Sequence, residues 1–107
     1  MATLSTHILD TALGTPAPGI TVALERDGTR LGQAVTDQDG RVRDWGTATP
    51  ITPGTYRLVF SVGEYFAGQG VAAFYSTITI DFIVRDNPHY HVPLLLSPFG
   101  YSTYRGS

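Results

Sequence analysis

Three histidines are the side chains in this sequence best suited to proton transfer near neutral pH, because imidazole titrates close to that range. His89 and His91 are two residues apart, so both imidazoles would leave the same face of a β-strand. His7 lies in an alternating segment, on its less apolar face. All three are therefore candidate acids or bases, although a strand histidine more often faces solvent without a chemical role.

The His-x-His pattern is also compatible with zinc, since two imidazoles on one face can share a metal ion. His7 would then be the third ligand of a three-histidine catalytic site. The pattern is weak evidence, because such pairs recur by chance and no carboxylate is fixed beside this one. We expect no metal, and keep a zinc hydrolase that uses His7, His89 and His91 as an alternative.

Arg41 follows Asp39-Gly40 in a predicted turn, where an arginine is usually solvated. Its functional interpretation is a fixed planar cation that holds an oxygen-rich ligand through two hydrogen bonds. Arg43 is a nearby competitor for that role. We treat Arg41 as a candidate binding residue and leave the contribution of Arg43 open.

The C-terminal residues could reach a site if residues 101–105 form a last strand at a sheet edge. Such a strand would deliver Tyr104, Arg105 and Ser107 to a fixed place, whereas chain termini normally fray. Ser107 lacks the Gly-x-Ser-x-Gly context of common serine hydrolases, so a covalent nucleophile is disfavoured. The sequence also has no Gly-rich phosphate-binding motif, which leaves nucleotide binding without support.

The elements that would position these residues are short β-strands separated by Gly, Pro, Asp and Asn. The predicted strands cover residues 4–9, 20–26, 30–36, 55–62, 76–84, 89–96 and 101–105, with a loop over 14–19 and one short edge strand near Ala48. A helix of one or two turns is predicted over 64–67. In the strand over 89–96, the apolar residues face away from the histidines and toward a core. This pattern predicts an all-β sandwich or barrel.

Composition restricts the partners of the chain. Its 107 residues fit a single domain, 1–107, and its net charge of −2 with no lysine argues against nucleic-acid or membrane-surface binding. Charged residues make up only 15%, below the usual quarter, which favours an oligomer that buries additional surface. The absence of cysteine excludes disulfides and does not fix the compartment. With no basic and apolar leader at the N-terminus and no run long enough to span a membrane, we expect a cytoplasmic protein.

Three blocks of sequence resemble the 5-hydroxyisourate hydrolases, also called transthyretin-like proteins. The first is Leu4-Ser5-Thr6-His7-Ile8-Leu9-Asp10, and the second is the turn Asp39-Gly40-Arg41. The third and most specific runs from His89 to the C-terminal Tyr104-Arg105-Gly106-Ser107. That final tetrapeptide separates the enzymes from transthyretin, the hormone carrier of the same fold. The resemblance covers the whole chain.

The resemblance implies a transthyretin-like β-sandwich of two four-stranded sheets with one short helix. It also implies a homotetramer, in which two chains join edge to edge and two dimers pack face to face. A channel would cross the tetramer, with active sites at the dimer–dimer interface. The family needs no cofactor.

The resemblance further implies hydrolysis of 5-hydroxyisourate to 2-oxo-4-hydroxy-4-carboxy-5-ureidoimidazoline in urate catabolism. The catalytic residues would be His7, Arg41, His91 and Ser107, with Tyr104 lining the substrate pocket. His89 belongs to the same motif without an assigned role. The alternatives are a transthyretin-like carrier of a small aromatic ligand, the zinc hydrolase, and a structural sandwich with incidental histidines.

Overall fold

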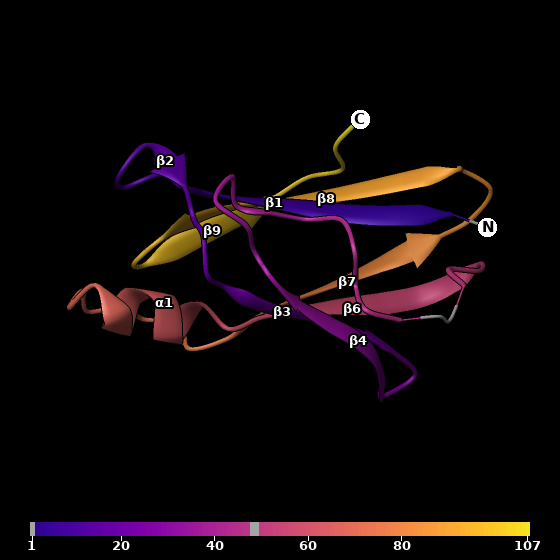
Figure 1. Ribbon diagram of the computed structural model, residues 1–107, viewed down its shortest axis with the longest axis horizontal. Helices are drawn as coiled ribbons and strands as arrows, with labels where there is room; N and C mark the ends of the chain where they lie inside the picture. Colours follow the sequence, from indigo (N-terminus) through magenta and orange to yellow (C-terminus); the bar gives the residue numbers. More distant parts are fainter. Residues whose placement is uncertain (1, 48–49) are drawn as a thin grey trace.

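Two β-sheets pack face to face in the computed structural model, which describes residues 2–47 and 50–107 (Figure 1). The first sheet contains β1 (Thr3–Asp10), β2 (Thr15–Pro16), β5 (Arg41–Val42), β8 (His89–Ser97) and β9 (Gly100–Thr103). The second contains β3 (Thr21–Arg26), β4 (Thr29–Val35), β6 (Gly54–Phe60) and β7 (Ile78–Val84). A short helix, α1 (Val62–Gly68), follows β6. The prediction of a two-sheet sandwich with one short helix is confirmed.

The strand order of the first sheet is β2-β1-β8-β9, and that of the second is β4-β3-β6-β7. The first sheet has five strands because β5 also pairs with β1, beside β2. The central pair, β1 and β8, is parallel, with Ser5 opposite His91 and His7 opposite Pro93. This pairing brings the first and last sequence motifs together across more than 80 residues of chain.

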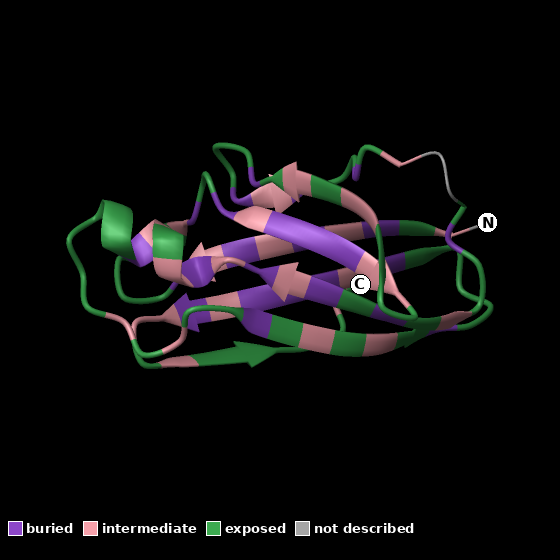
Figure 2. Cartoon of the chain, turned by 90° about the horizontal axis from the view of Figure 1, so that it is seen from below, coloured by how far each residue is buried: buried purple, intermediate pink, exposed green. Residues whose placement is uncertain are grey.

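The core lies between the sheets, where alternate residues of each strand are buried. Figure 2 shows this alternation as buried bands separated by half-buried and exposed ones. The strands contribute Leu4, Ile8, Val22, Leu24, Tyr56, Leu58, Phe60, Ile78, Val84, Tyr90, Val92, Leu94 and Leu96. The inward face predicted for residues 89–96 is therefore confirmed, and in each strand the side chains between the buried ones form the outer surfaces.

Local chemistry explains several boundaries. Asp27 and Gly28 both have positive φ (52° and 77°), as a tight two-residue hairpin between β3 and β4 requires. The loop predicted over 14–19 contains the two-residue β2, which pairs with the end of β1. The short strand predicted near Ala48 lies outside the described residues.

The last strand is shorter than predicted, ending at Thr103 and not at Arg105. The reason is Pro93, which has no N–H to donate to the partner strand. Its carbonyl points toward β9 and accepts a hydrogen bond from the Thr103 hydroxyl at 2.7 Å. Beyond that point the regular ladder stops, and residues 104–107 run alongside β8 without strand geometry.

Candidate active site

The outer face of β1 and β8 carries the candidate catalytic side chains. Because inward and outward residues alternate, Ser5 and His7 leave β1 opposite to the buried Leu4 and Thr6. His91 leaves the same side of β8 and lies directly across from Ser5. His7 and His91 are each half-buried, so this face is neither core nor fully solvated surface.

Arg41 reaches this face through β5, which pairs it with His7. The preceding turn is closed by Asp37, whose Oδ1 accepts hydrogen bonds from the backbone N–H groups of Asp39 and Arg41, each at 2.9 Å. These bonds lower the pKa of the Asp37 carboxyl, the bond from Arg41 most of all. Gly40 has φ 72°, and a Cβ there would collide with the carbonyl oxygen of Ile8. The turn therefore requires glycine beside the arginine, and it fixes the backbone of Arg41 against β1.

Hydroxyl groups of β1 hold both histidines of β8. Ser5 Oγ is 2.7 Å from Nδ1 of His91 and 3.2 Å from Nε2 of His89. Thr3 Oγ1 is hydrogen bonded to the other nitrogen of His89. The two imidazole rings are stacked, with centroids 6.5 Å apart and planes at 15°. His89 and His91 thus share one face, as predicted, and are connected through Ser5.

The C-terminal segment comes back along β8 to this face. The backbone N–H of Gly106 donates to the carbonyl of His91 at 2.9 Å. A Cβ at Gly106 would collide with the His91 ring at Cδ2, so only glycine lets the segment lie this close. Ser107 then lines a cavity of about 430 Å³ together with Ser5, Arg41, Arg43, His89 and His91.

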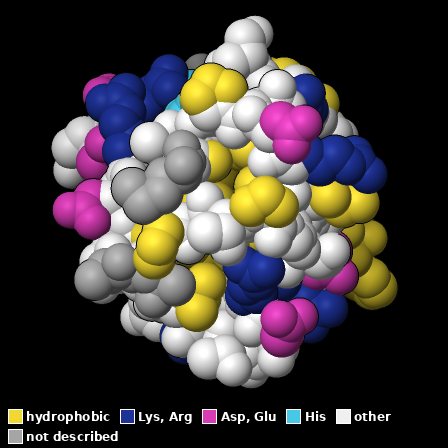
Figure 3. All heavy atoms as spheres, turned by 90° about the vertical axis from the view of Figure 1, so that its right-hand side faces the viewer, with side chains coloured by type: hydrophobic (Ala, Val, Ile, Leu, Met, Phe, Trp, Pro, Cys, Tyr) yellow, Lys and Arg dark blue, Asp and Glu magenta, His cyan; other side chains and the backbone are white. Residues whose placement is uncertain are grey.

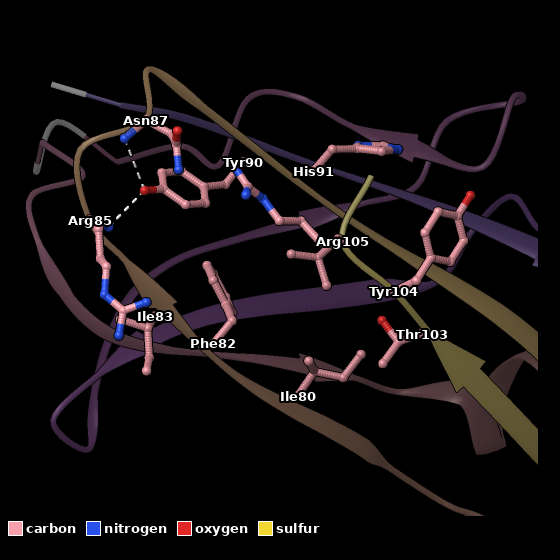
Figure 4. A pocket seen from close by; sticks show the side chains of 11 residues that line it. Ile80, Phe82, Ile83, Arg85, Asn87, Tyr90, His91, Thr103, Tyr104 and Arg105 are labelled. Carbon is pink, nitrogen blue, oxygen red and sulfur yellow. Dashed lines mark hydrogen bonds between the residues drawn. The ribbon is translucent and has the colours of Figure 1, made fainter. Parts of the chain in front are cut away.

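Two of the predicted site residues, His7 and Tyr104, lie beside this cavity and do not line it. His7 adjoins it through its pairing with Arg41. Tyr104 is 58% exposed and lines a neighbouring pocket of about 390 Å³, with His91 at the boundary of the two. In Figure 4, Tyr104 lies at the end of that pocket opposite Arg85 and Asn87. Arg105 lies over the ring of Tyr90, with 5.5 Å between the guanidinium carbon and the ring centroid.

Burial and a neighbouring arginine both favour neutral histidines in the site. Burial, and then repulsion from Arg41, lowers the pKa of both His7 and His91 below 6.5. Over residues 2–47 and 50–107, neither Arg41 nor Arg43 forms an ion pair with a carboxylate. Figure 3 shows arginine side chains gathered beside a histidine on the end of the sandwich near the N-terminus. The site therefore combines neutral imidazoles, able to accept protons, with guanidinium groups available to an oxygen-rich ligand.

The described part of the chain contains no group of three or more His, Cys, Asp or Glu side chains arranged to hold a metal ion. The nitrogens of His89 are both engaged by hydroxyl groups, as is one nitrogen of His91. Among residues 2–47 and 50–107, no helix is long and apolar enough to cross a membrane.

No role for Ser5, Thr3 or Gly106 is predicted from the sequence. Strand alternation gives Ser5 the same face as His7, but its contact with His91 depends on the parallel register between distant strands. Thr3 precedes the predicted strand, and the need for glycine at 106 depends on the path of the C-terminal segment. The available signal was the i, i+2 spacing of Thr3, Ser5 and His7 in an alternating strand.

Known proteins resemble this chain over nearly its full length. The protein-family model described as "HIUase/Transthyretin family" matches residues 4–106 of the sequence. The 5-hydroxyisourate hydrolase of Salmonella dublin is 48% identical, over 97% of this chain and 80% of that protein. The solved structure of Klebsiella pneumoniae 5-hydroxyisourate hydrolase has a TM-score of 0.91 at 45% identity, covering 100% of this chain and 94% of that one. Sea bream transthyretin in complex with thyroxine has a TM-score of 0.88 at 31% identity, covering 98% and 95%.

Proposed function

The chain belongs to the HIUase/transthyretin family, and we propose that it is a 5-hydroxyisourate hydrolase of urate catabolism. Its product would be 2-oxo-4-hydroxy-4-carboxy-5-ureidoimidazoline. The observation that supports this function most is the outer face of β1 and β8, where imidazoles of lowered pKa adjoin two arginines that form no ion pair among the described residues. Such a face suits the attack of water on a carbonyl carbon of an oxygen-rich ring.

The reaction adds water to a ring carbonyl carbon and breaks the adjacent C–N bond. His7 and His91 orient the water and remove its proton as the new C–O bond forms. Arg41 holds the substrate oxygens and the negative charge that develops on the carbonyl oxygen. The imidazolium then returns the proton to the leaving ring nitrogen, so that the ring opens to a carboxylic acid, which releases its proton to solvent and becomes a carboxylate. Ser107 contributes its hydroxyl to substrate nitrogens, and Tyr104 lines the pocket.

The enzyme works as a homotetramer, a dimer of dimers, with residues 1–107 as one domain and no cofactor. Two features favour assembly: the low charge content, and the exposed large apolar side chains, including Ile83 of β7 and Tyr101 of β9 at sheet edges. The site cavity is open to one side in the single chain, so a second copy could close it. Sedimentation equilibrium should give four times the chain mass of 11.5 kDa, and a mass of 11.5 kDa would contradict the tetramer.

The location of the enzyme is proposed to be the cytoplasm, as expected from the sequence. Immunoblotting of fractionated cells would test this. Recovery in the cytosolic fraction is expected, and recovery in an extracellular or periplasmic fraction would contradict it.

The proposed activity is tested by generating 5-hydroxyisourate in place from urate and urate oxidase. Its ultraviolet absorbance is followed with and without the protein, and faster decay with the protein is expected. Treatment with a chelator should not change the rate; loss of activity that zinc restores would support the zinc alternative. Decay at the spontaneous rate, together with thyroxine binding, would replace the enzyme with a carrier of the kind represented by sea bream transthyretin.

A further inference from the structure

Ser5 contacts both C-terminal histidines with a single hydroxyl group. Its Oγ is 2.7 Å from Nδ1 of His91 and 3.2 Å from Nε2 of His89. On the other side of His89, Nδ1 is hydrogen bonded to Oγ1 of Thr3. The Thr3 hydroxyl also lies 3.4 Å from the carbonyl oxygen of Pro88, to which it can donate. A continuous chain of hydrogen bonds thus runs from His91 to a backbone carbonyl.

The carbonyl at the end of this chain favours one direction of donation, because it can only accept. When the Thr3 hydroxyl donates to Pro88, its oxygen accepts from Nδ1–H of His89. The unprotonated Nε2 of His89 then accepts from the Ser5 hydroxyl. Ser5 in turn accepts from Nδ1–H of His91, so the proton of neutral His91 is on Nδ1 and its Nε2 is unprotonated.

We infer that Ser5 and His89 are positioning residues that hold His91 as the Nδ1–H tautomer and leave its Nε2 as the base. The inference rests on the proposed function, which requires an imidazole that enters the reaction with a free nitrogen. Both the neutral Nδ1–H form and the imidazolium carry a proton on Nδ1. Ser5 therefore accepts the same hydrogen bond before and after Nε2 takes a proton from water, and the ring does not need to move.

The environment of His91 agrees with this assignment. Burial, Arg41 and the neighbouring histidines lower the pKa of His91, so the ring is neutral at neutral pH and has a tautomer to select. The side-chain hydrogen bond of the His91 ring is made at Nδ1, to Ser5 Oγ. A ring held at Nδ1 by a hydroxyl group can present its Nε2 to a ligand.

Long-range 1H–15N NMR spectra read the tautomer directly, and the sequence contains only three histidines to assign. In the unaltered protein, His91 should be in the Nδ1–H form at a pH above its pKa. Ser5→Ala should shift it toward the commoner Nε2–H form, whereas Ser5→Thr keeps a hydroxyl and should preserve it. An Nε2–H tautomer in the unaltered protein, or an unchanged tautomer in Ser5→Ala, would overturn the inference.

Steady-state kinetics add a second readout. Ser5→Ala should lower kcat about 10- to 100-fold with little change in KM, as expected for loss of a group that orients a catalytic imidazole. His89→Gln should recover most of the activity lost in His89→Leu, because the Gln amide oxygen can accept from Ser5 in place of Nε2. Thr79→Ala, which removes an exposed hydroxyl from β7, is the matched control. A rise in KM alone for His89→Leu would instead assign His89 to direct substrate contact and contradict the inference.

The spectra require no substrate, which separates this inference from the proposed function. A Ser5-dependent Nδ1–H tautomer in a protein that does not accelerate 5-hydroxyisourate decay would support the positioning role and contradict the activity. Rapid turnover by a protein whose His91 carries its proton on Nε2 would support the activity and contradict the positioning role.

Discussion

The outer faces of the two sheets differ in whether their charged side chains form ion pairs. On the second sheet, Glu25, Arg57 and Asp81 lie side by side on β3, β6 and β7. Opposite charges alternate across these strands, and we call the three residues the charge ladder. Arg57 donates two hydrogen bonds to Asp81, at 2.7 and 3.1 Å. On the first sheet, Arg41 lies beside His7 without an ion pair among the described residues.

This difference separates a solvated surface from the proposed binding surface. Cations that are already neutralised, as in the charge ladder of the second sheet, have little attraction left for a ligand. Burial and the charge of Arg41 lower the pKa of His7 and His91, and an arginine that forms no ion pair can bind an anionic or oxygen-rich group. Gly40 and Gly106 also shape this face. Gly40 lets its turn approach β1, and Gly106 lets the C-terminal segment approach β8, more closely than a side chain would permit.

The largest effect is expected at Arg41. Arg41→Lys retains the charge but loses the planar pair of donors, so kcat/KM should fall about 100- to 1000-fold, as for removal of one oxyanion-stabilising donor. The matched change in the charge ladder, Arg57→Lys, should leave kcat/KM unchanged. Both are measured by the ultraviolet assay. Near-normal turnover by Arg41→Lys would contradict the role of the arginine.

A smaller loss is expected from Gly106→Ala, which adds one methyl group against the His91 ring. Displacement of the C-terminal segment or of the ring should lower kcat/KM about 10- to 100-fold, since misplacement near 1 Å can cost that much. Gly68→Ala is the control, because a Cβ there meets open space. If both variants have the same activity as the unaltered protein, the close approach of Gly106 to His91 has no functional importance.

The pH dependence should follow the lowered pKa values of His7 and His91. The rate should rise with pH and level off with an apparent pKa below 6.5, because each imidazole must be neutral to accept a proton. Unfolding should respond with the same sign. Between the folded and unfolded pKa the unfolded chain binds more protons, so stability is lost as pH falls below about 6.5.

Titration of the histidine C2–H signals by 1H NMR would measure these shifts directly. In Arg41→Gln, removal of the nearby positive charge should raise the pKa of both His7 and His91. Asp81→Asn, on the opposite sheet, should leave them unchanged. A pKa for His91 above 6.5 in the unaltered protein would contradict the electrostatic account.

The smallest effect is expected in the charge ladder. Arg57 and Asp81 have about half of their side-chain surface exposed, and ion pairs of that kind contribute little to stability. Arg57→Gln should therefore change Tm by no more than about 3 °C in a thermal unfolding experiment. A large drop in Tm would show that the second sheet depends on its charges for folding.

Strand alternation allowed much of the fold to be predicted. The outward position of His7 on β1 and the inward face of β8 followed from the period of two, and the strands over 20–26 and 30–36 were expected from their separation by turn-forming residues. The two-sheet architecture came from the resemblance to a family, and strand spacing alone left a barrel open. Local pattern carries no information on which distant strands pair, so the contact of Ser5 with His91 was not predictable from it.

The positions of the predicted site residues also depended in part on contacts between distant segments. Outward orientation of His7 and His91 was predictable, whereas the place of Ser107 depended on where the last strand ends. That end is determined by a missing N–H on the partner strand, at Pro93, and not by the residues of the last strand itself. Tyr104 falls just past this end, which is why it lies in the neighbouring pocket.

The most direct test of the account compares the intact chain with one that ends at Thr103. The two are assayed for decay of freshly generated 5-hydroxyisourate, after circular dichroism has shown the same fold. Removal of residues 104–107 takes away Ser107 and the Gly106 contact with His91 but leaves every strand complete. The account predicts rapid decay with the intact chain and loss of nearly all acceleration with the shortened one. Equal acceleration by both would contradict a hydrolytic site built on the outer face of β1 and β8 with the C-terminal segment.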